Sequence, residues 1–273
     1  MSDFASPFDF IVTKEHRRFV EFCDACRRYR YIGLCYGPPG IGKTVSARTF
    51  ARQDLIEYLL ANCHMLDLPA QPAVLQGGTM FYTPPVSNSP SRLEKAITTG
   101  RKQLNDLHYW MQGAMEKKLI HDLSAEKPEV TELIIIDEAD RLKAIGLEQM
   151  RDIYDRSQIG LVLIGMPGIE KRLSRYPQLY SRVGFVHHFK PLSSEEVQFV
   201  LRHKWQQLGL NLDLGDFTDN ESVAAITRIT NGNFRLLQRL LGQVERVLQI
   251  NELHLVTKEV VEAARELLII GSL

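Results

Sequence analysis

The glycine-rich stretch from Gly37 to Thr44 reads GPPGIGKT and fits the pattern G-x-x-x-x-G-K-[ST] at every fixed position. Glycines let a backbone curl so that successive N–H groups face phosphate oxygens, and the helix that follows presents its positive end to them. Lys43 would reach the β- and γ-phosphates, and the Thr44 hydroxyl would bind Mg²⁺. A glycine loop without a ligand is the alternative. We expect ATP to bind at Gly37, Pro38, Pro39, Gly40, Ile41, Gly42, Lys43, Thr44 and Val45.

Two carboxylates follow the apolar run Leu133-Ile-Ile-Ile. If that run is a buried strand, it delivers Asp137 beside the magnesium ion and leaves Glu138 to polarise a water molecule for attack on the γ-phosphate. The alternative is an acidic strand end before a helix N-terminus, which also favours negative charge. With the glycine-rich stretch upstream, the pair predicts a hydrolytic site in which Thr44 and Asp137 hold the metal, and Lys43 and Glu138 act on the phosphate. The letters DEAD alone do not indicate a helicase, because no other helicase-like motif is apparent.

A sheet is needed to position these residues, and the hydrophobic pattern predicts one. Five apolar runs have the length and composition of strands, and helix-like segments separate them. Strands that alternate with helices indicate a parallel sheet covered on both faces. The expected strands lie within 31–37, 78–84, 131–140, 160–165 and 183–189, and the expected helices within 15–30, 45–61, 89–113 and 146–158.

After Pro191 the pattern changes to helices alone, most of them with polar caps. They are expected within 193–209, 219–232, 233–250 and 257–268. The fold class is therefore expected to be α/β, a P-loop NTPase core with a small all-helical lid. The core would cover residues 1–190, including an N-terminal helix, and the lid residues 191–273.

Composition limits the class of protein further. The 273 residues carry 33 basic and 33 acidic side chains, so net charge does not indicate a nucleic-acid partner and any basic surface must be local. No apolar run approaches the ~20 residues that cross a bilayer, and the first ten residues lack the basic start and apolar stretch of a signal peptide. These features favour a cytoplasmic protein.

Cys23 and Cys26 form a lone C-x-x-C pair, and Cys35 and Cys63 are the other cysteines. A zinc site needs a second pair at suitable spacing, and His64 beside Cys63 is too little to complete one. We expect buried, reduced thiols rather than a structural metal.

From about Thr13 to its end, the chain resembles the AAA+ ATPases, on the strength of the two motifs and the helical segments after them. The resemblance implies ATP at the junction between subunits of a ring or helix. It also matches PQLYSRVG with the segment that provides an arginine finger, with Arg182 as the first candidate and Arg175 and Arg172 behind it. Such a guanidinium stabilises charge on the transferring phosphate in a neighbour's site. An ordinary surface arginine is the alternative.

Two further stretches match the nucleotide-sensing parts of that family. TNGNFRLLQRLL is similar to the start of its second-sensor helix, which implies that Arg235 touches the γ-phosphate, and Asn233 is expected to cap this helix in any case. In LVLIGMPG the first-sensor position, usually polar, falls at Met166, and a thioether orients water poorly. This departure favours a slow or partner-stimulated ATPase over a motor.

Within AAA+ the chain most resembles the transposition regulators of the TnsC, TniB and MuB type. IIIDEADRL and the run from Glu148 to Ser193 together carry that resemblance. It implies a homo-oligomer, ring or filament, that binds ATP and duplex DNA, marks the DNA as a target and recruits or activates a transposase. A target-selection protein would be a further partner, and hydrolysis would dismantle the assembly.

DNA binding without net charge requires a local basic stripe repeated in each subunit. The helix expected within 89–113 offers Arg92, Lys95, Arg101 and Lys102, and RRYRY at 27–31 is a second, aromatic-rich candidate. The alternative is solvated helical charge, or arginines that complement a helix dipole. No recognition helix stands out, so the expected contacts are to the DNA backbone rather than to bases.

Three other functions stay open. A replication initiator or clamp-loader-like ATPase would be favoured by a longer C-terminal DNA-binding domain. A secretion ATPase of the ExeA kind would be favoured by a membrane or peptidoglycan-binding extension. A nucleotide-gated scaffold that never hydrolyses ATP is favoured by Met166 and disfavoured by Glu138 and Arg182.

Overall fold

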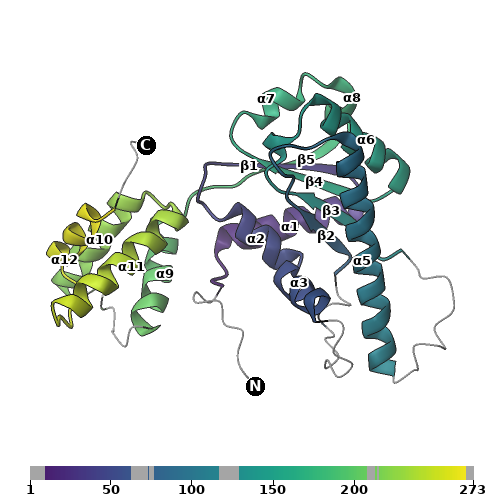
Figure 1. Cartoon of the computed structure of the whole chain (residues 1–273). Helices are drawn as coiled ribbons and strands as arrows, with labels where there is room; N and C mark the ends of the chain where they lie inside the picture. Colours follow the sequence, from purple (N-terminus) through teal and green to yellow (C-terminus); the bar gives the residue numbers. More distant parts are fainter. Residues whose placement is uncertain are drawn as a thin grey trace. The chain divides into compact units, whose positions relative to one another are not determined.

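A computed structural model describes residues 10–62, 73, 77–116, 129–207, 213 and 215–268 (Figure 1). The chain packs as two units. The core unit comprises residues 18–37 and 43–189, and the lid unit comprises the described parts of 1–17, 38–42 and 190–273. The expected division into 1–190 and 191–273 stays a prediction. The packing adds that residues 38–42, inside the glycine-rich stretch, group with the helical part of the chain.

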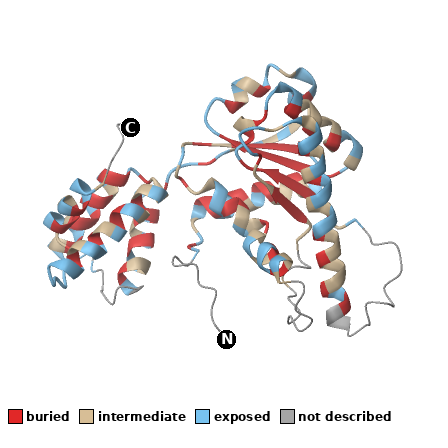
Figure 2. Ribbon diagram, viewed as in Figure 1, coloured by how far each residue is buried: buried red, intermediate tan, exposed pale blue. Residues whose placement is uncertain are grey.

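The core unit is built on five parallel strands in the order β2-β3-β4-β1-β5. Every residue of β3 and β4 is buried, which explains why these strands read as continuous apolar runs. Figure 2 shows this burial running through the middle of the sheet. The strands are β1 (Ile32–Tyr36), β2 (Thr79–Tyr82), β3 (Leu133–Ile136), β4 (Gly160–Gly165) and β5 (Val183–His188), which confirms the predicted sheet.

Helices cover this sheet on two sides, with α1 and α2 below it and α6, α7 and α8 above it in the view of Figure 1. The apolar faces of α3, α5, α6, α7 and α8 share one buried cluster with the strands, and it contains Leu34, Leu93, Ile134, Met150 and Leu163. The helices are α1 (Lys14–Tyr29), α2 (Lys43–Phe50), α3 (Gln53–Ala61), α5 (Pro90–Glu116), the 3-10 turn η2 (Ala139–Arg141), α6 (Ala144–Ser157), α7 (Ile169–Leu173) and α8 (Pro177–Tyr180).

One expected helical segment is divided. Residues 45–61 form the end of α2 and the whole of α3, with a break at Ala51 and Arg52. Arg52 has a left-handed backbone with φ of 53°, and its guanidinium donates to the carbonyl oxygen of Ala73. The sequence has no glycine or proline at this break, so the pattern of residue types could not reveal it.

The lid unit carries α9 (Ser194–Gln207), α10 (Phe217–Thr230), α11 (Phe234–Ile250) and α12 (Lys258–Glu266). Their apolar faces enclose a second core around the buried Trp205 and Leu237. Polar residues cap three of these helices as expected, because Asp216, Asn233 and Thr257 accept hydrogen bonds from first-turn N–H groups. The sequence pattern therefore predicts the helical content of this unit well.

Glu196 of α9 anchors the start of α1 within the lid unit. Its carboxylate is buried and accepts hydrogen bonds from the backbone N–H groups of Lys14 and Glu15, at 2.9 and 3.3 Å. It also accepts from the N–H of Ser193, at 3.0 Å. Negative charge is favourable at the N-terminus of a helix, so one side chain stabilises the first turns of two helices far apart in the sequence.

Candidate nucleotide-binding and hydrolysis site

The glycine-rich stretch lies where its chemistry requires, between the end of β1 at Tyr36 and the start of α2 at Lys43. Gly40 and Gly42 have φ of 78° and 105°, in the left-handed region that glycine adopts without strain. The Lys43 ammonium donates to the Gly37 carbonyl oxygen at 2.5 Å. The Lys43 side chain therefore already contacts the loop in which it would bind phosphate groups.

The predicted metal ligands lie in direct contact. The Thr44 hydroxyl donates to the Asp137 carboxylate at 2.7 Å, and Asp137 is only 2% exposed. Burial raises the pKa of Asp137 above its usual value, and the hydrogen bond from Thr44 opposes that rise. Two hard oxygen donors held side by side suit Mg²⁺, which prefers oxygen ligands.

Glu138 differs from its neighbour Asp137 in exposure and partners. Its backbone is left-handed, with φ of 49° and ψ of 45°, at the turn that leads into η2. Its carboxylate forms an ion pair with Arg141, and its side chain is 49% exposed. The predicted catalytic base is thus held by a cation of its own chain. Sequence reasoning missed Arg141, although its position three residues after Glu138 was visible.

Arg141 also ties this turn to the segment before α5. Its guanidinium donates to the Pro84 carbonyl oxygen at 2.9 Å, and its own carbonyl accepts from the Asn88 side chain at 3.2 Å. The same Asn88 amide donates to the Pro85 carbonyl oxygen at 2.9 Å. Two hydrogen bonds therefore connect the turn beside Glu138 with the segment that leads into α5, the helix that carries Arg92 and Lys95, and the third holds that segment together.

Asp140 occupies the space beside the end of β4, where sequence reasoning expected a polar residue and found Met166. The Asp140 carboxylate accepts a hydrogen bond from the Met166 N–H at 2.7 Å. A Cβ atom added at Gly165 would lie 2.6 Å from the same carboxylate oxygen, so a side chain there would displace it. The polar group at this position thus comes from η2 rather than from β4. The absence of a side chain at Gly165 leaves room for that carboxylate.

Within the lid unit, the first turn of α11 contacts residues 38–42 of the glycine-rich stretch. The Asn233 side chain donates to the Pro39 carbonyl oxygen at 2.9 Å, and the Arg235 N–H donates to the Gly40 carbonyl oxygen at 2.8 Å. Asn233 also caps α11 by accepting from the Leu236 N–H, as expected. The Arg235 side chain is exposed and has no hydrogen bond or ion pair within the described residues. Its predicted role on the γ-phosphate stays a prediction.

Arg182, the predicted arginine finger, directly precedes β5 and is held by Asp155 of α6. Its Nε and Nη2 atoms lie 2.6 and 2.9 Å from the two carboxylate oxygens of Asp155. Its third nitrogen donates to the carbonyl oxygen of Gln178. Both charged side chains are about one-third exposed, at 32% and 30%. The guanidinium is therefore engaged on its own chain, although it remains accessible.

The sheet separates Arg182 from the nucleotide end of the core unit. β5 is parallel to β1, with Val183 opposite Ile32 and His188 opposite Tyr36. Gly37 follows the carboxyl end of β1, whereas Arg182 precedes the amino end of β5. A five-residue strand spans about 16 Å, which is much longer than an arginine side chain. Arg182 thus lies at the opposite end of the sheet from Gly37 and Lys43.

The two other candidates for the arginine finger, Arg172 and Arg175, differ from Arg182 in their contacts. Arg172 donates to the carbonyl oxygens of Asp140 and Leu142, so it supports the turn after Glu138. Arg175 is exposed and makes no side-chain hydrogen bond or ion pair within the described part of the chain. Arg172 is accordingly a structural residue of the site, while Arg175 has no assigned partner.

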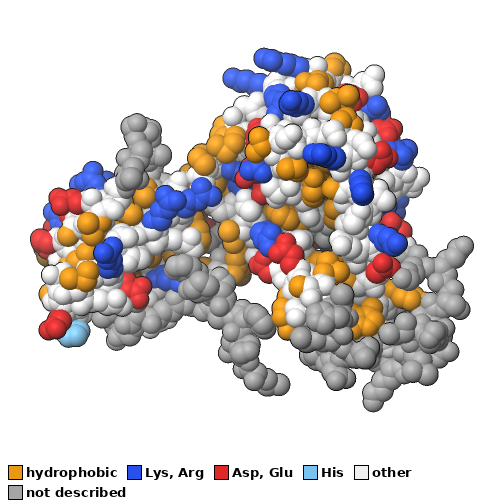
Figure 3. Space-filling model, in the orientation of Figure 1, with side chains coloured by type: hydrophobic (Ala, Val, Ile, Leu, Met, Phe, Trp, Pro, Cys, Tyr) orange, Lys and Arg blue, Asp and Glu red, His pale blue; other side chains and the backbone are white. Residues whose placement is uncertain are grey.

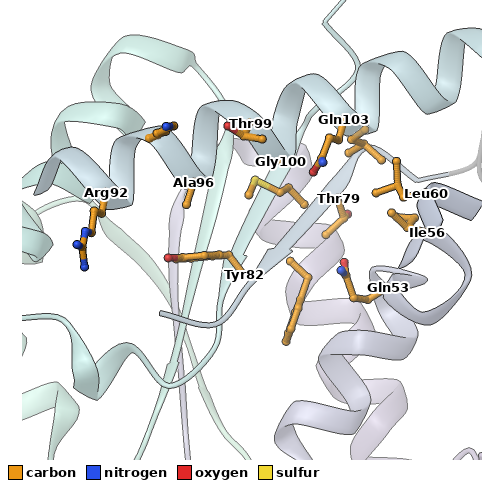
Figure 4. A pocket seen from close by; sticks show the side chains of 14 residues that line it. Gln53, Ile56, Leu60, Thr79, Tyr82, Arg92, Ala96, Thr99, Gly100 and Gln103 are labelled. Atoms are coloured by element: carbon orange, nitrogen blue, oxygen red, sulfur yellow. The ribbon is translucent and has the colours of Figure 1, made fainter. Parts of the chain in front are cut away.

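The predicted DNA contacts on α5 divide into two groups. Arg92, Lys95 and Lys102 are exposed, whereas Arg101 pairs with Glu129 at 3.0 Å and donates to Ser157 at 2.9 Å. Arg92 and Lys95 also line a largely apolar hollow of about 430 Å³ between α3, β2 and α5 (Figure 4). Arg101 therefore holds the protein's own surface, and three exposed cations remain on α5.

The second basic candidate, residues 27–31, forms an aromatic cluster with β5. The rings of Tyr29, Tyr31 and Phe185 lie with centroids 5.6 to 6.3 Å apart. Arg27 pairs with Asp24 at 2.7 Å, and the Arg28 guanidinium lies over the Tyr29 ring. Figure 3 shows basic and acidic side chains interspersed over the visible face of the core unit, with several basic ones at the top of the view. No single-sign surface dominates the visible face.

The three described cysteines, Cys23, Cys26 and Cys35, are buried free thiols. Burial raises the pKa of the Cys26 thiol to about 12 and that of Cys23 well above its usual value, so both are unreactive. Cys63 and His64 lie outside the described residues. Within the described ranges, no helix is both long and apolar enough to span a bilayer.

Comparison with known proteins identifies the class that this fold and site define. A family model described as "AAA domain" matches residues 26–173, more than half of the chain. A Staphylococcus aureus relative named "Potential ATP-binding protein" is 46% identical over 274 residues, which cover 96% of this chain and 97% of the relative. The chain belongs to the AAA family of P-loop proteins, and it is an ATP-binding AAA+ ATPase.

A more distant relative has a more specific name. The "Mu-like prophage FluMu DNA transposition protein B" of Haemophilus influenzae is 25% identical over 238 residues. The match covers 84% of this chain and 70% of that protein.

Solved structures confirm the fold. The RuvB Holliday junction branch migration motor of Thermotoga maritima matches with a TM-score of 0.59 at 17% identity, covering 94% of this chain and 70% of that one. The ORC1 protein of Aeropyrum pernix, solved in complex with DNA, matches with a TM-score of 0.55 at 19% identity, covering 94% and 65%. At these identities the likeness establishes the AAA+ fold, a parallel five-stranded sheet flanked by helices with a helical C-terminal part.

Proposed function

We propose that this chain is an ATP-dependent regulator of DNA transposition. It oligomerises on duplex DNA, marks the DNA as a target, and recruits or activates a transposase with the help of a target-selection protein. ATP hydrolysis then dismantles the assembly. The position of Arg182, at the end of the sheet opposite Gly37, carries the assembly-dependent part of this proposal. The Haemophilus influenzae relative supports the transposition part. Such a protein would act in the cytoplasm.

The hydrolytic half of the proposal assigns roles to residues of one subunit. The Thr44 hydroxyl and Asp137 carboxylate fit Mg²⁺ because they are oxygen donors already in contact, at 2.7 Å. When bound, the metal would neutralise charge on the phosphate oxygens. Lys43 binds the terminal phosphates, and Glu138 takes a proton from the attacking water once Arg141 releases it.

A neighbouring subunit would supply the positive charge that stabilises the transferring phosphate, from its Arg182. Arg182 cannot reach phosphates held by its own Lys43 across the length of the sheet. If it acts on ATP, it acts on the ATP of another subunit, with a head-to-tail contact that repeats around a ring or along a filament. Arg175 is the second candidate because it is exposed and has no side-chain partner within the described residues.

DNA is proposed to contact the exposed cations of α5. Arg92, Lys95 and Lys102 lie within ten residues, a rise of about 15 Å along a helix. One subunit would therefore contact only a few phosphates, and affinity would come from repeating the contact in many subunits.

Stimulation of hydrolysis by DNA has a physical route in the same unit. Arg141 pairs with Glu138 and bonds the Pro84 carbonyl, six residues before α5 begins at Pro90. A shift at the start of α5 would weaken the hold of Arg141 on Glu138. The resting rate is proposed to be slow for this reason, rather than because of Met166 alone.

Electron microscopy with a non-hydrolysable ATP analogue tests the proposal, with and without duplex DNA. We expect rings or filaments on DNA that require the analogue. A sample in which DNA never carries an ordered assembly would exclude the transposition function and favour another AAA+ role. The scaffold alternative makes a different prediction, because a protein that never hydrolyses ATP would leave DNA at the same rate with ATP as with the analogue.

A further inference from the structure

Arg182 and Asp155 form a bidentate ion pair, which would hold the arginine side chain in one orientation. Two nitrogens of the guanidinium meet two oxygens of one carboxylate, at 2.6 and 2.9 Å. Bidentate pairs of this kind are stronger and more directional than single contacts. The third nitrogen bonds the Gln178 carbonyl, so each terminal nitrogen of the guanidinium has an acceptor in the subunit itself.

A second arginine holds Asp155 in place. Arg151, one turn earlier on α6, donates to the Asp155 carboxylate at 2.7 Å and to Glu148 at 2.9 Å. The order along this network is Glu148, Arg151, Asp155 and Arg182. Asp155 thus stays oriented toward Arg182 by contacts within its own helix. Asp152, also on α6, pairs instead with Arg156 at 2.6 Å and offers a matched site for a control substitution outside this network.

The backbone on either side of Arg182 is fixed, so only its side chain is available to move. The Arg182 carbonyl accepts from the Ile32 N–H at 3.2 Å, and its N–H donates to the Leu179 carbonyl oxygen at 3.1 Å. The side chain is 32% exposed, which lets an outside anion approach the guanidinium without any rearrangement of β5.

We propose that Asp155 restrains Arg182 while a subunit lacks a neighbour, and that the triphosphate bound by the neighbour competes with Asp155 for the guanidinium. This inference rests on the proposed function, in which Arg182 acts in a neighbouring site. A carboxylate and a phosphate offer the same paired oxygen acceptors to arginine, so one can replace the other. Asp155 is a positioning residue, because it touches no substrate and acts through Arg182.

The test measures ATPase rate per subunit against protein concentration, in the full chain, for Asp155→Ala, Asp155→Asn and the control Asp152→Asn. Loss of a partly exposed bidentate pair should change the ratio of released to restrained Arg182 side chains by about threefold to tenfold. We expect Asp155→Ala to raise the rate by that factor at low protein concentration and to lower the concentration that gives half-maximal rate. Asp155→Asn, which keeps one oxygen acceptor, should shift both quantities in the same direction by less. Asp152→Asn should leave them unchanged, because the Asp152 carboxylate forms no ion pair with Arg182 or Arg151 within the described residues.

The outcomes separate the inference from the proposed function. A rate for Asp155→Ala that is unchanged, or reduced as far as that of Arg182→Ala, overturns the restraint. If Arg182→Ala itself keeps the full rate at high protein concentration, the finger assignment fails instead. Thermal unfolding of each variant identifies misfolding, and Asp155→Asn decides the matter if Asp155→Ala is unstable.

Discussion

The binding half and the hydrolysis half of this site are organised differently. Thr44 and Asp137, which would hold Mg²⁺, already contact each other at 2.7 Å. Glu138 and Arg182, which would act on the γ-phosphate, are instead paired with Arg141 and Asp155 of the same chain. With the proposed roles, a single subunit would be prepared to bind ATP but not to hydrolyse it.

Burial explains why the two halves can behave differently. Asp137 is 2% exposed, and a buried carboxylate that lost its hydrogen bond would carry a large penalty. The Glu138 side chain is 49% exposed and that of Arg182 is 32% exposed, so water can replace their partners at little cost. With the proposed roles, fixed contacts would define binding, and exchangeable ion pairs would leave hydrolysis to be controlled from outside the subunit.

The largest expected effect comes from Glu138→Gln. The variant keeps hydrogen bonding but cannot accept a proton, so ATPase activity should fall by about 10² to 10⁴-fold. ATP affinity should stay within about threefold of wild type, because Glu138 does not belong to the binding half. Assemblies on DNA should persist, as measured by the rate of dissociation after dilution. Equal dissociation rates for the variant and wild type would remove hydrolysis as the cause of disassembly.

Lys43→Ala breaks the binding half. The ammonium that bonds the Gly37 carbonyl would no longer be available to the phosphates, and the loss of charge-assisted hydrogen bonds should weaken ATP binding by about 30-fold or more. Titration calorimetry measures this affinity, and Lys171→Ala on α7 is a matched control that should bind normally. Unchanged affinity in Lys43→Ala would overturn the site assignment.

Arg141→Ala tests the restraint on Glu138. Freeing the carboxylate should raise the ATPase rate without DNA by about twofold to fivefold, the scale of an exposed ion pair, and reduce the stimulation by DNA. Arg156→Ala, which removes a surface arginine paired with Asp152 and Glu94, is the control. A tenfold fall in the rate would instead mean that Arg141 orients Glu138 for catalysis.

The smallest expected effect is a change in thermal stability caused by Asp137→Asn. The sign of this change follows from the pKa of Asp137. Burial raises that pKa in the folded state, so the ionised carboxylate opposes folding as pH rises through the raised value. The neutral amide removes this penalty. We expect a higher Tm for the nucleotide-free variant at pH 7, and a difference that disappears below about pH 4, near the ordinary pKa of an aspartate. Thermal unfolding from pH 3 to 8 measures it, and a lower Tm at pH 7 would contradict this account.

Local patterns were sufficient to predict the fold and to select the candidate binding residues, whose roles stay predictions. Each of the signals involved spans only a few residues. They are the glycines at 40 and 42, a lysine and a threonine at fixed spacing, and apolar runs of strand length. The parallel sheet and the lid helices follow from the same short-range signals. For the sheet and the helices the sequence and the structure agree closely.

The restraints could not be predicted, because they join residues through tertiary packing. Asp155 and Arg182 are 27 residues apart, and nothing in either segment indicates the other. Asp140 fills the place beside Met166 only because η2 folds back against β4. The pair Glu138 and Arg141 is close in sequence, yet it depends on a left-handed backbone at Glu138 that no glycine marks.

Mixing two inactive variants tests the central claim, that hydrolysis needs residues of two subunits. Glu138→Gln keeps Arg182, and Arg182→Ala keeps Glu138, so a junction between them contains one complete site. At equal amounts with random head-to-tail assembly, about one junction in four is complete, and ATPase activity should recover to about a quarter of the wild-type rate. Activity that stays at the average of the two variants would contradict the claim.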